Sequence, residues 1–121
     1  MSASNVFPHA ILAAMAIAIA GEANAGYFNG ARLKDLVDAD DRVESANASP
    51  SDFQKSGLLL GFVAGVHDTA NGTAFCGRSY VTIGQAVAVV KKYFRENPNK
   101  WDQQASDLVS NALSSAFPCR K

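Results

Sequence analysis

The chain has 121 residues, which fits one domain, and its 11 basic residues balance its 11 acidic residues. The sequence has no basic field of the kind that attracts nucleic acid, so we expect no nucleic-acid partner. It also has no charge run that would indicate a polybasic membrane anchor or an acidic tail.

The first 25 residues are typical of a cleavable signal peptide. Residues 10–20 form a run of eleven apolar residues, and Ala23-Asn24-Ala25 is a small-x-small cleavage site. Eleven helical residues span about 16 Å against a bilayer core of ~30 Å, so the run is too short for a membrane anchor. The segment before it lacks Lys and Arg, and a buried apolar N-terminal helix is the alternative. We expect cleavage after Ala25, no membrane contact afterwards, and one domain over residues 26–121.

A weak helix is expected from Asn29 to about Ser45, after the cleavage site. Its apolar stripe is thin, and a break near Asp40-Asp41 is compatible with the pattern. Its acidic side chains are expected to face solvent; they are Asp35, Asp38, Asp40, Asp41 and Glu44.

A second helix is expected from near Pro50, a residue that suits the first helical position, to about Val66. Its middle, residues 58–66, is apolar on almost every side, which predicts burial all round. Three glycines recur every four residues and leave one bare stripe along the helix; they are Gly57, Gly61 and Gly65. Two interpretations of the stripe stay open, namely close packing against another helix of the same chain and a homodimer seam.

A loop over residues 67–79, with a turn signal at Asn71-Gly72, separates these helices from two more. The third helix opens with the capping box Thr82-x-x-Gln85 and stops at Asn97-Pro98. Its cationic residues Lys91, Lys92 and Arg95 are expected to face water. A fourth helix over about residues 99–116 would bury Trp101. Since residues 79–81 are the single strand candidate, we predict an all-α fold, a small compact bundle of four to five helices.

Two cysteines, Cys76 and Cys119, lie in the part of the chain that would remain after export. In an oxidising compartment an isolated pair has one connectivity, and closing a loop of ~43 residues would stabilise the fold by about 4 kcal/mol. A catalytic or metal-binding thiol is the alternative, but the spacing is wrong for a metal site. The disulfide would fix the loop to the end of the last helix, and a rigid loop loses less entropy on binding.

The pair His67-Asp68 together with Cys76 invites a hydrolase interpretation. An oxidised Cys76 cannot act as a nucleophile, and the sequence has no phosphate-binding loop, metal-ligand cluster or G-x-S-x-G turn. We therefore predict no enzymatic activity, no catalytic residue, no metal and no cofactor. The alternative is that the protein is a small periplasmic acid-stress chaperone. The carboxylates of Asp38, Asp40 and Asp41 give this alternative weak support, because such clusters more often form a solvent-exposed helix face.

Four motifs occur in order between Gly57 and Cys119. They are Gly61-Phe62-Val63-Ala64-Gly65-Val66-His67-Asp68; Phe75-Cys76; Val81-Thr82 and Gln85 before Tyr93-Phe94 and Asn97-Pro98; and Ala112-Leu113 before Ala116-Phe117-Pro118-Cys119. Together they resemble the Rap/Tai family of type VI secretion immunity proteins, although a second cysteine pair that many members carry is missing. The resemblance implies a small helical periplasmic protein whose partner is a cognate peptidoglycan amidase effector.

The resemblance also implies a mechanism, in which a constrained loop fills the open cleft of a papain-like amidase and excludes the substrate. The expected effector-binding residues are Asp68, Asn71, Thr73, Phe75 and Arg78. Phe75 is equally suited to the core, because it adjoins a cysteine. The resemblance further implies that the inhibitor acts as a dimer, in which case the glycine stripe could form the contact between the two copies.

Overall fold

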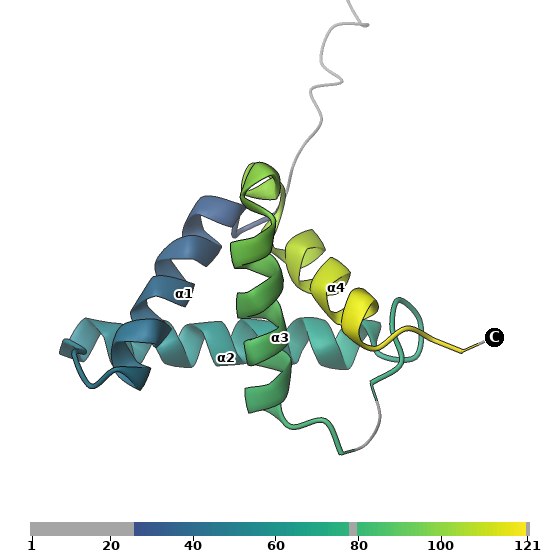
Figure 1. Cartoon of the computed structure of the whole chain (residues 1–121), viewed down its shortest axis with the longest axis horizontal. Helices are drawn as coiled ribbons and strands as arrows, with labels where there is room; N and C mark the ends of the chain where they lie inside the picture. The colour runs from purple at the N-terminus through teal and green to yellow at the C-terminus, as the bar shows by residue number, and fades with distance from the viewer. Residues whose placement is uncertain (1–25, 78–79, 121) are drawn as a thin grey trace, which may run out of the picture.

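Helices make up the fold, as the hydrophobic periodicity predicts. The computed structural model describes residues 26–77 and 80–120, so the predicted signal peptide and its cleavage site at Ala25 lie outside the described residues. Four α-helices occur in the described part, together with one short 3-10 helix; they are α1 (Gly30–Glu44), α2 (Pro50–Ala70), α3 (Ile83–Glu96), η1 (Pro98–Lys100) and α4 (Ala105–Ala116) (Figure 1). The predicted all-α bundle of four to five helices is confirmed. None of the described helices combines the length and the apolar character that crossing a membrane requires.

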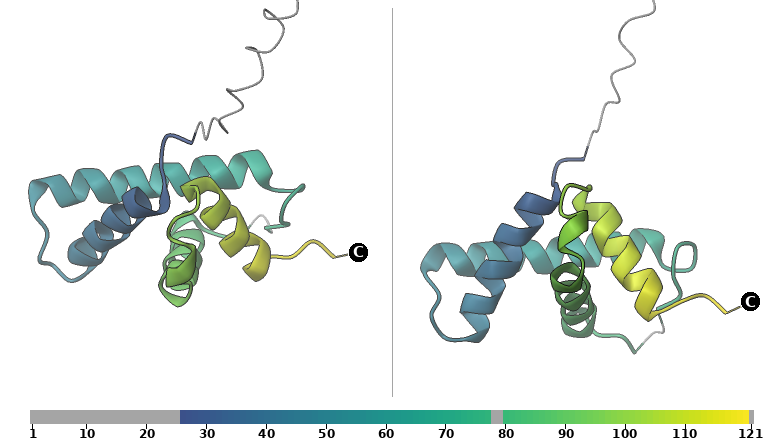
Figure 2. Two further views of the ribbon diagram at one scale, coloured as in Figure 1. Left: turned by 90° about the horizontal axis from the view of Figure 1, so that it is seen from above. Right: turned by 45° about the horizontal axis from the view of Figure 1, so that its top comes forward.

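The helix α2 is the longest element, and α1, α3 and α4 gather on one side of it (Figure 2). The core lies between these layers and is built from Leu33, Leu36, Leu59, Val63, Phe75, Val87, Val90, Phe94, Leu108, Val109 and Leu113. The other side of α2 faces solvent, where Phe53 is 61% exposed and Leu58 41% exposed. The expectation that residues 58–66 are buried all round is therefore wrong, because the helices that pack on α2 cover a single side and leave Leu58 exposed.

The starts of α1, α2 and α3 agree with the predicted boundaries, whereas the end of α2 and the start of α4 differ from them. Asn29 accepts a hydrogen bond from the backbone N–H of Arg32 at 2.9 Å, and α1 then runs to Glu44 without the break considered at Asp40-Asp41. The capping box of α3 is formed, because the Gln85 side chain accepts the backbone N–H of Thr82 at 2.8 Å and the Thr82 hydroxyl oxygen accepts that of Gln85 at 3.2 Å. The helix α2 continues four residues beyond Val66, so residues 67–70 are helical rather than part of the loop.

The last helix begins at Ala105 and not near residue 99, because the preceding residues make other contacts. Trp101 stacks on Phe94 with ring centroids 4.9 Å apart, and its indole N–H donates to the Phe94 carbonyl at 2.8 Å. The backbone N–H of Gly30 donates to the Gln103 carbonyl at 2.9 Å. A Cβ at position 30 would lie 2.1 Å from the Trp101 carbonyl oxygen, so this approach requires glycine.

A buried charge cluster joins α1 to α3. Lys91 is only 4% exposed, and its Nζ lies within 2.8 Å of carboxylate oxygens of Asp40, Asp41 and Glu44. Burial opposes the charge of Lys91, but its hydrogen bonds to these carboxylates outweigh burial and hold its pKa above the ordinary lysine value. Arg95 also pairs with Asp41. The expectation that Lys91 and Asp40 face water is wrong, because the two helices bring them together inside the fold.

Candidate functional site

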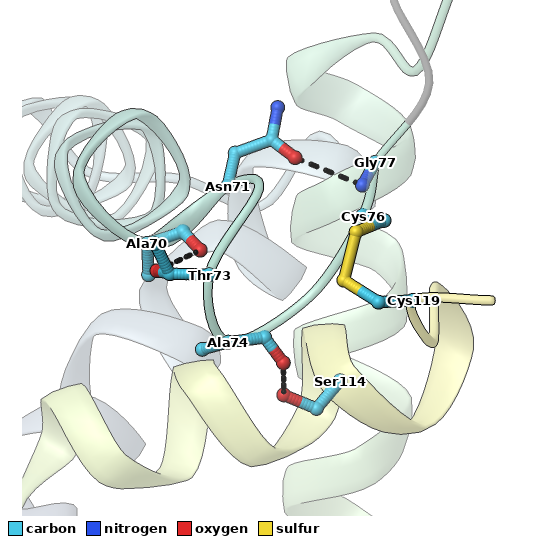
Figure 3. The surroundings of a disulfide bond; sticks show 8 residues. All are labelled: Ala70, Asn71, Thr73, Ala74, Cys76, Gly77, Ser114 and Cys119. Carbon is cyan, nitrogen blue, oxygen red and sulfur yellow. Dashed lines mark hydrogen bonds between the residues drawn. A yellow bond between two sulfur atoms is a disulfide. The ribbon is translucent and has the colours of Figure 1, made fainter. Parts of the chain in front are cut away.

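The predicted disulfide between Cys76 and Cys119 is confirmed, with Cα atoms 4.7 Å apart (Figure 3). It links the segment after α2 to the segment after α4. Two hydrogen bonds support the same junction: the backbone N–H of Cys76 donates to the Phe117 carbonyl at 2.8 Å, and the Ser114 hydroxyl donates to the Ala74 carbonyl at 2.9 Å. We call residues 71–77 the pinned loop, because these contacts fix it to the C-terminal end of α4.

The pinned loop is also braced internally. The Ala70 carbonyl at the end of α2 accepts hydrogen bonds from the backbone N–H groups of Thr73 and Ala74, at 3.1 and 2.9 Å, and from the Thr73 hydroxyl at 2.9 Å. Gly72 has a φ of +86°, a left-handed conformation that favours glycine, and its N–H donates to the Phe75 carbonyl at 2.7 Å. These hydrogen bonds and the turn at Gly72 brace the backbone of the pinned loop.

Phe75 lies in the core and not on the surface. Its side chain has no exposed area, and its ring centroid is 5.4 Å from that of His67 on α2. Of the two roles considered for Phe75, the structure supports packing and contradicts contact with a partner, because a fully buried ring cannot be reached without opening the fold. Phe75 instead anchors the pinned loop to the hydrophobic core.

Three of the other predicted residues lie around the end of α2. Asp68 is on its last turn, with 82% of the side chain exposed, and its carboxylate lies 3.2 Å from His67 Nδ1. Asn71 and Thr73 are exposed on the pinned loop. The Asn71 side-chain oxygen accepts the backbone N–H of Gly77 at 3.0 Å, while its amide nitrogen points away from Gly77 (Figure 3). Arg78, the remaining predicted residue, lies outside the described residues.

Two residues that support the loop were not predicted to do so. Ser114 braces it from α4, and nothing in the sequence distinguishes Ser114 from its neighbour Ser115. His67 was assigned to the loop, but it belongs to α2 and packs under the loop, where a Cβ at position 77 would lie 3.0 Å from its Nε2. The pair His67-Asp68 lies in the last turn of α2, which agrees with interpreting it as a helix C-terminus rather than as part of a hydrolase site.

The arrangement offers little chemistry of its own. Both cysteines are in the disulfide, so neither Cys76 nor Cys119 is a free nucleophile. One group of carboxylates in the described part has the spacing of a metal site, formed by Asp40, Asp41 and Glu44. The ammonium group of Lys91 already lies among those oxygens, so the cluster fits an internal ion pair rather than a cation-binding site.

The glycine stripe faces outward. A Cβ added at Gly57, Gly61 or Gly65 would meet no atom within 4 Å, which contradicts close packing against another helix in the described part of the chain. Two of the glycines border an apolar groove of about 440 Å³ between α2 and α4. It has no charged lining residue and is formed by Gly61, Phe62, Gly65, Val66, Thr69, Ala70, Ser106 and Ser110.

Comparison with known proteins adds one match. A family model described as Rap1a immunity proteins matches residues 26–119. The matched region begins directly after the predicted cleavage site and ends at Cys119, so it contains the whole pinned loop and both cysteines. A search of curated proteins gave no significant match.

Proposed function

The chain belongs to the Rap1a immunity protein family, and from that premise we propose that it protects its own cell against a type VI secretion effector. We propose further that the effector is a peptidoglycan amidase and that the two proteins meet in the periplasm after the signal peptide has been removed. The protein binds this partner and does not turn over a substrate.

The observation that carries the proposal is the pinned loop. Its backbone is held by the disulfide, by two hydrogen bonds to the end of α4 and by the turn at Gly72. A loop with one shape loses little conformational entropy on binding, so more of its contact energy remains as affinity. Such a loop is suited to entering a cleft that is open to a substrate.

The exposed groups on and beside the loop suit contact with a polar active site. Asp68 offers a carboxylate, Asn71 an amide nitrogen, and Thr73 a hydroxyl oxygen that can accept while its hydrogen is donated to Ala70. We propose that these three residues meet donors and acceptors in the amidase cleft and exclude the substrate.

We propose that the exposed face of α2 joins two copies of the protein. The supporting observation is the open space over Gly57, Gly61 and Gly65, which would let a helix of a second copy approach closely. The apolar groove beside Gly61 and Gly65 extends the same surface. Sedimentation of the G61R variant, compared with the unsubstituted protein, tests this: a single species of monomer mass in both would contradict it.

Co-expression tests the main proposal. Cells that export a peptidoglycan amidase effector encoded next to this protein's gene to their periplasm should survive when this protein is present. The T73R variant, which places a long charged side chain on the pinned loop, should bind the amidase at least 100-fold more weakly and fail to protect. A matched control, N47R in the exposed turn between α1 and α2, should bind within twofold of the unsubstituted protein. Loss of the cells with the unsubstituted protein present would refute the proposal.

A periplasmic acid-stress chaperone is the second candidate, and the buried Lys91 favours it. Protonation of Asp41 in acid would remove a partner of both Lys91 and Arg95 and so weaken the contact between α1 and α3. A chaperone of this kind should bind many unrelated unfolded proteins at pH 2–3 and release them at pH 7. Binding that stays restricted to one effector would exclude it.

A further inference from the structure

We propose that cleavage after Ala25 creates an α-ammonium group at Gly26 that the side-chain oxygen of Gln104 receives. Processing during export would then complete the junction between the N-terminal segment and α4. The inference rests on the predicted cleavage site, and it is independent of which effector the protein binds.

The start of the described chain is held in place. The Phe28 carbonyl accepts the backbone N–H of Ala105 at 3.0 Å, and Asn29 and Gln104 form an antiparallel bridge. The Phe28 ring lies 5.3 Å from the ring of Phe62 on α2. These contacts position the residues just before Phe28 beside the beginning of α4.

Gly26 and Gln104 are in direct contact. A Cβ at position 26 would lie 1.6 Å from Gln104 Oε1 and 2.4 Å from Gln104 Cδ. No side chain can occupy that space, so the amide carbonyl of Gln104 lies against the Cα atom of Gly26. The nitrogen of Gly26 is one covalent bond away from that atom.

Within the described residues, no donor reaches the side-chain oxygen of Gln104. Its Oε1 atom is buried and has no hydrogen-bond partner among the residues that the structure describes, whereas buried acceptors in folded proteins are almost always paired. In the uncleaved chain the Gly26 nitrogen is a peptide group whose single hydrogen has a fixed direction. After cleavage it carries three hydrogens that rotate about the Cα–N bond, so one of them can turn toward Gln104.

Two opposing charges act on an ammonium group at this position. Gln104 is the N-cap of α4, and the positive end of the helix dipole disfavours a cation there. Asp107 in the first turn of α4 supplies a compensating negative charge at the same helix end. A hydrogen bond from an ammonium group to a carbonyl oxygen is charge-assisted and therefore stronger than a neutral one.

A chemical double-mutant cycle tests the inference. The protein is purified from the periplasm, its intact mass is measured, and its α-amine is acetylated at neutral pH, which removes the charge and two donors. Acetylation should raise the unfolding equilibrium constant in urea about tenfold in the unsubstituted protein. It should have less than a twofold effect in the Q104L variant, which lacks the acceptor. An equal effect in both proteins, or an intact mass that starts at another residue, overturns the inference.

A second pair of variants tests the contact itself. G26A keeps the ammonium group but adds the Cβ that collides with Gln104, and it should be about tenfold less stable than the unsubstituted protein. In a Q104A background, where the collision is relieved, the same substitution should change the unfolding constant less than twofold. A G26A substitution that is neutral in both backgrounds contradicts the inference.

Discussion

Replacing both Cys76 and Cys119 with serine removes the covalent link that holds the pinned loop to α4. The bond closes a loop across 43 positions, for which the chain-entropy model gives about 4 kcal/mol of stability, at the upper end of what such bonds deliver. Small domains have a total stability of only 5–15 kcal/mol. For a domain of this size, a loss of about 4 kcal/mol lowers the Tm by about 15–30 °C.

The same double variant should also weaken binding of the amidase while the helices remain folded. The hydrogen bonds from Cys76 N–H to Phe117 and from Ser114 to Ala74 survive, so only part of the loop is released. Re-ordering one or two backbone residues on binding costs about 1–2 kcal/mol each, or about 1–4 kcal/mol in total, which corresponds to about a 5- to 1000-fold loss of affinity.

The assay is calorimetric titration of the amidase at a temperature where far-UV circular dichroism shows equal helix content in the two proteins. The S114A variant, which keeps the disulfide and loses one loop hydrogen bond, serves as an intermediate and should bind less than tenfold more weakly. Unchanged affinity in the double serine variant would show that the disulfide stabilises the fold without shaping the binding surface, and the reasoning about the pinned loop would be wrong.

Three further perturbations test the packing and the charges. G30A places a methyl group 2.1 Å from the Trp101 carbonyl oxygen and should destabilise the fold by about 2–4 kcal/mol in urea unfolding, whereas G84A, whose methyl group would lie 3.9 Å from the nearest atom, should not destabilise it. F75A empties a fully buried site and should cost about 3–5 kcal/mol; a cost below 1 kcal/mol would mean that the ring is not in the core. K91M should cost about 3 kcal/mol at pH 7. Burial would raise the pKa of Asp41, but its hydrogen bonds to Arg95 and Lys91 outweigh burial and hold the pKa below that of an aspartate in the unfolded chain. Asp41 therefore contributes to the free energy of unfolding above about pH 4, and this contribution is lost as the pH falls further. The stability difference between K91M and the unsubstituted protein should therefore shrink between pH 4 and pH 2, and a constant difference would contradict the pairing.

Local patterns in the sequence predict the four helices and the disulfide, although not every helix boundary. The capping residues Asn29 and Thr82 placed two helix starts correctly, because a cap depends on atoms within one turn of the chain. The cysteine pair was predictable because two cysteines allow a single connectivity. The family resemblance, confirmed by the match over residues 26–119, also followed from motif order alone.

Which helix faces are covered depends on how distant segments pack together, and the sequence does not show it. The apolar pattern of α2 predicts burial on every side, but the helices that pack on it leave Leu58 and the glycine stripe in solvent. Lys91 was expected in water, and its burial depends on carboxylates that are 47–51 positions away in the chain. Phe75 became a core residue, while Asp68, Asn71 and Thr73 remained on the surface. Hydrophobic periodicity predicts whether a segment forms a helix, because it depends on residues within that segment. Burial of a helix face depends on which distant segments pack against it, so the sequence of one helix does not show it.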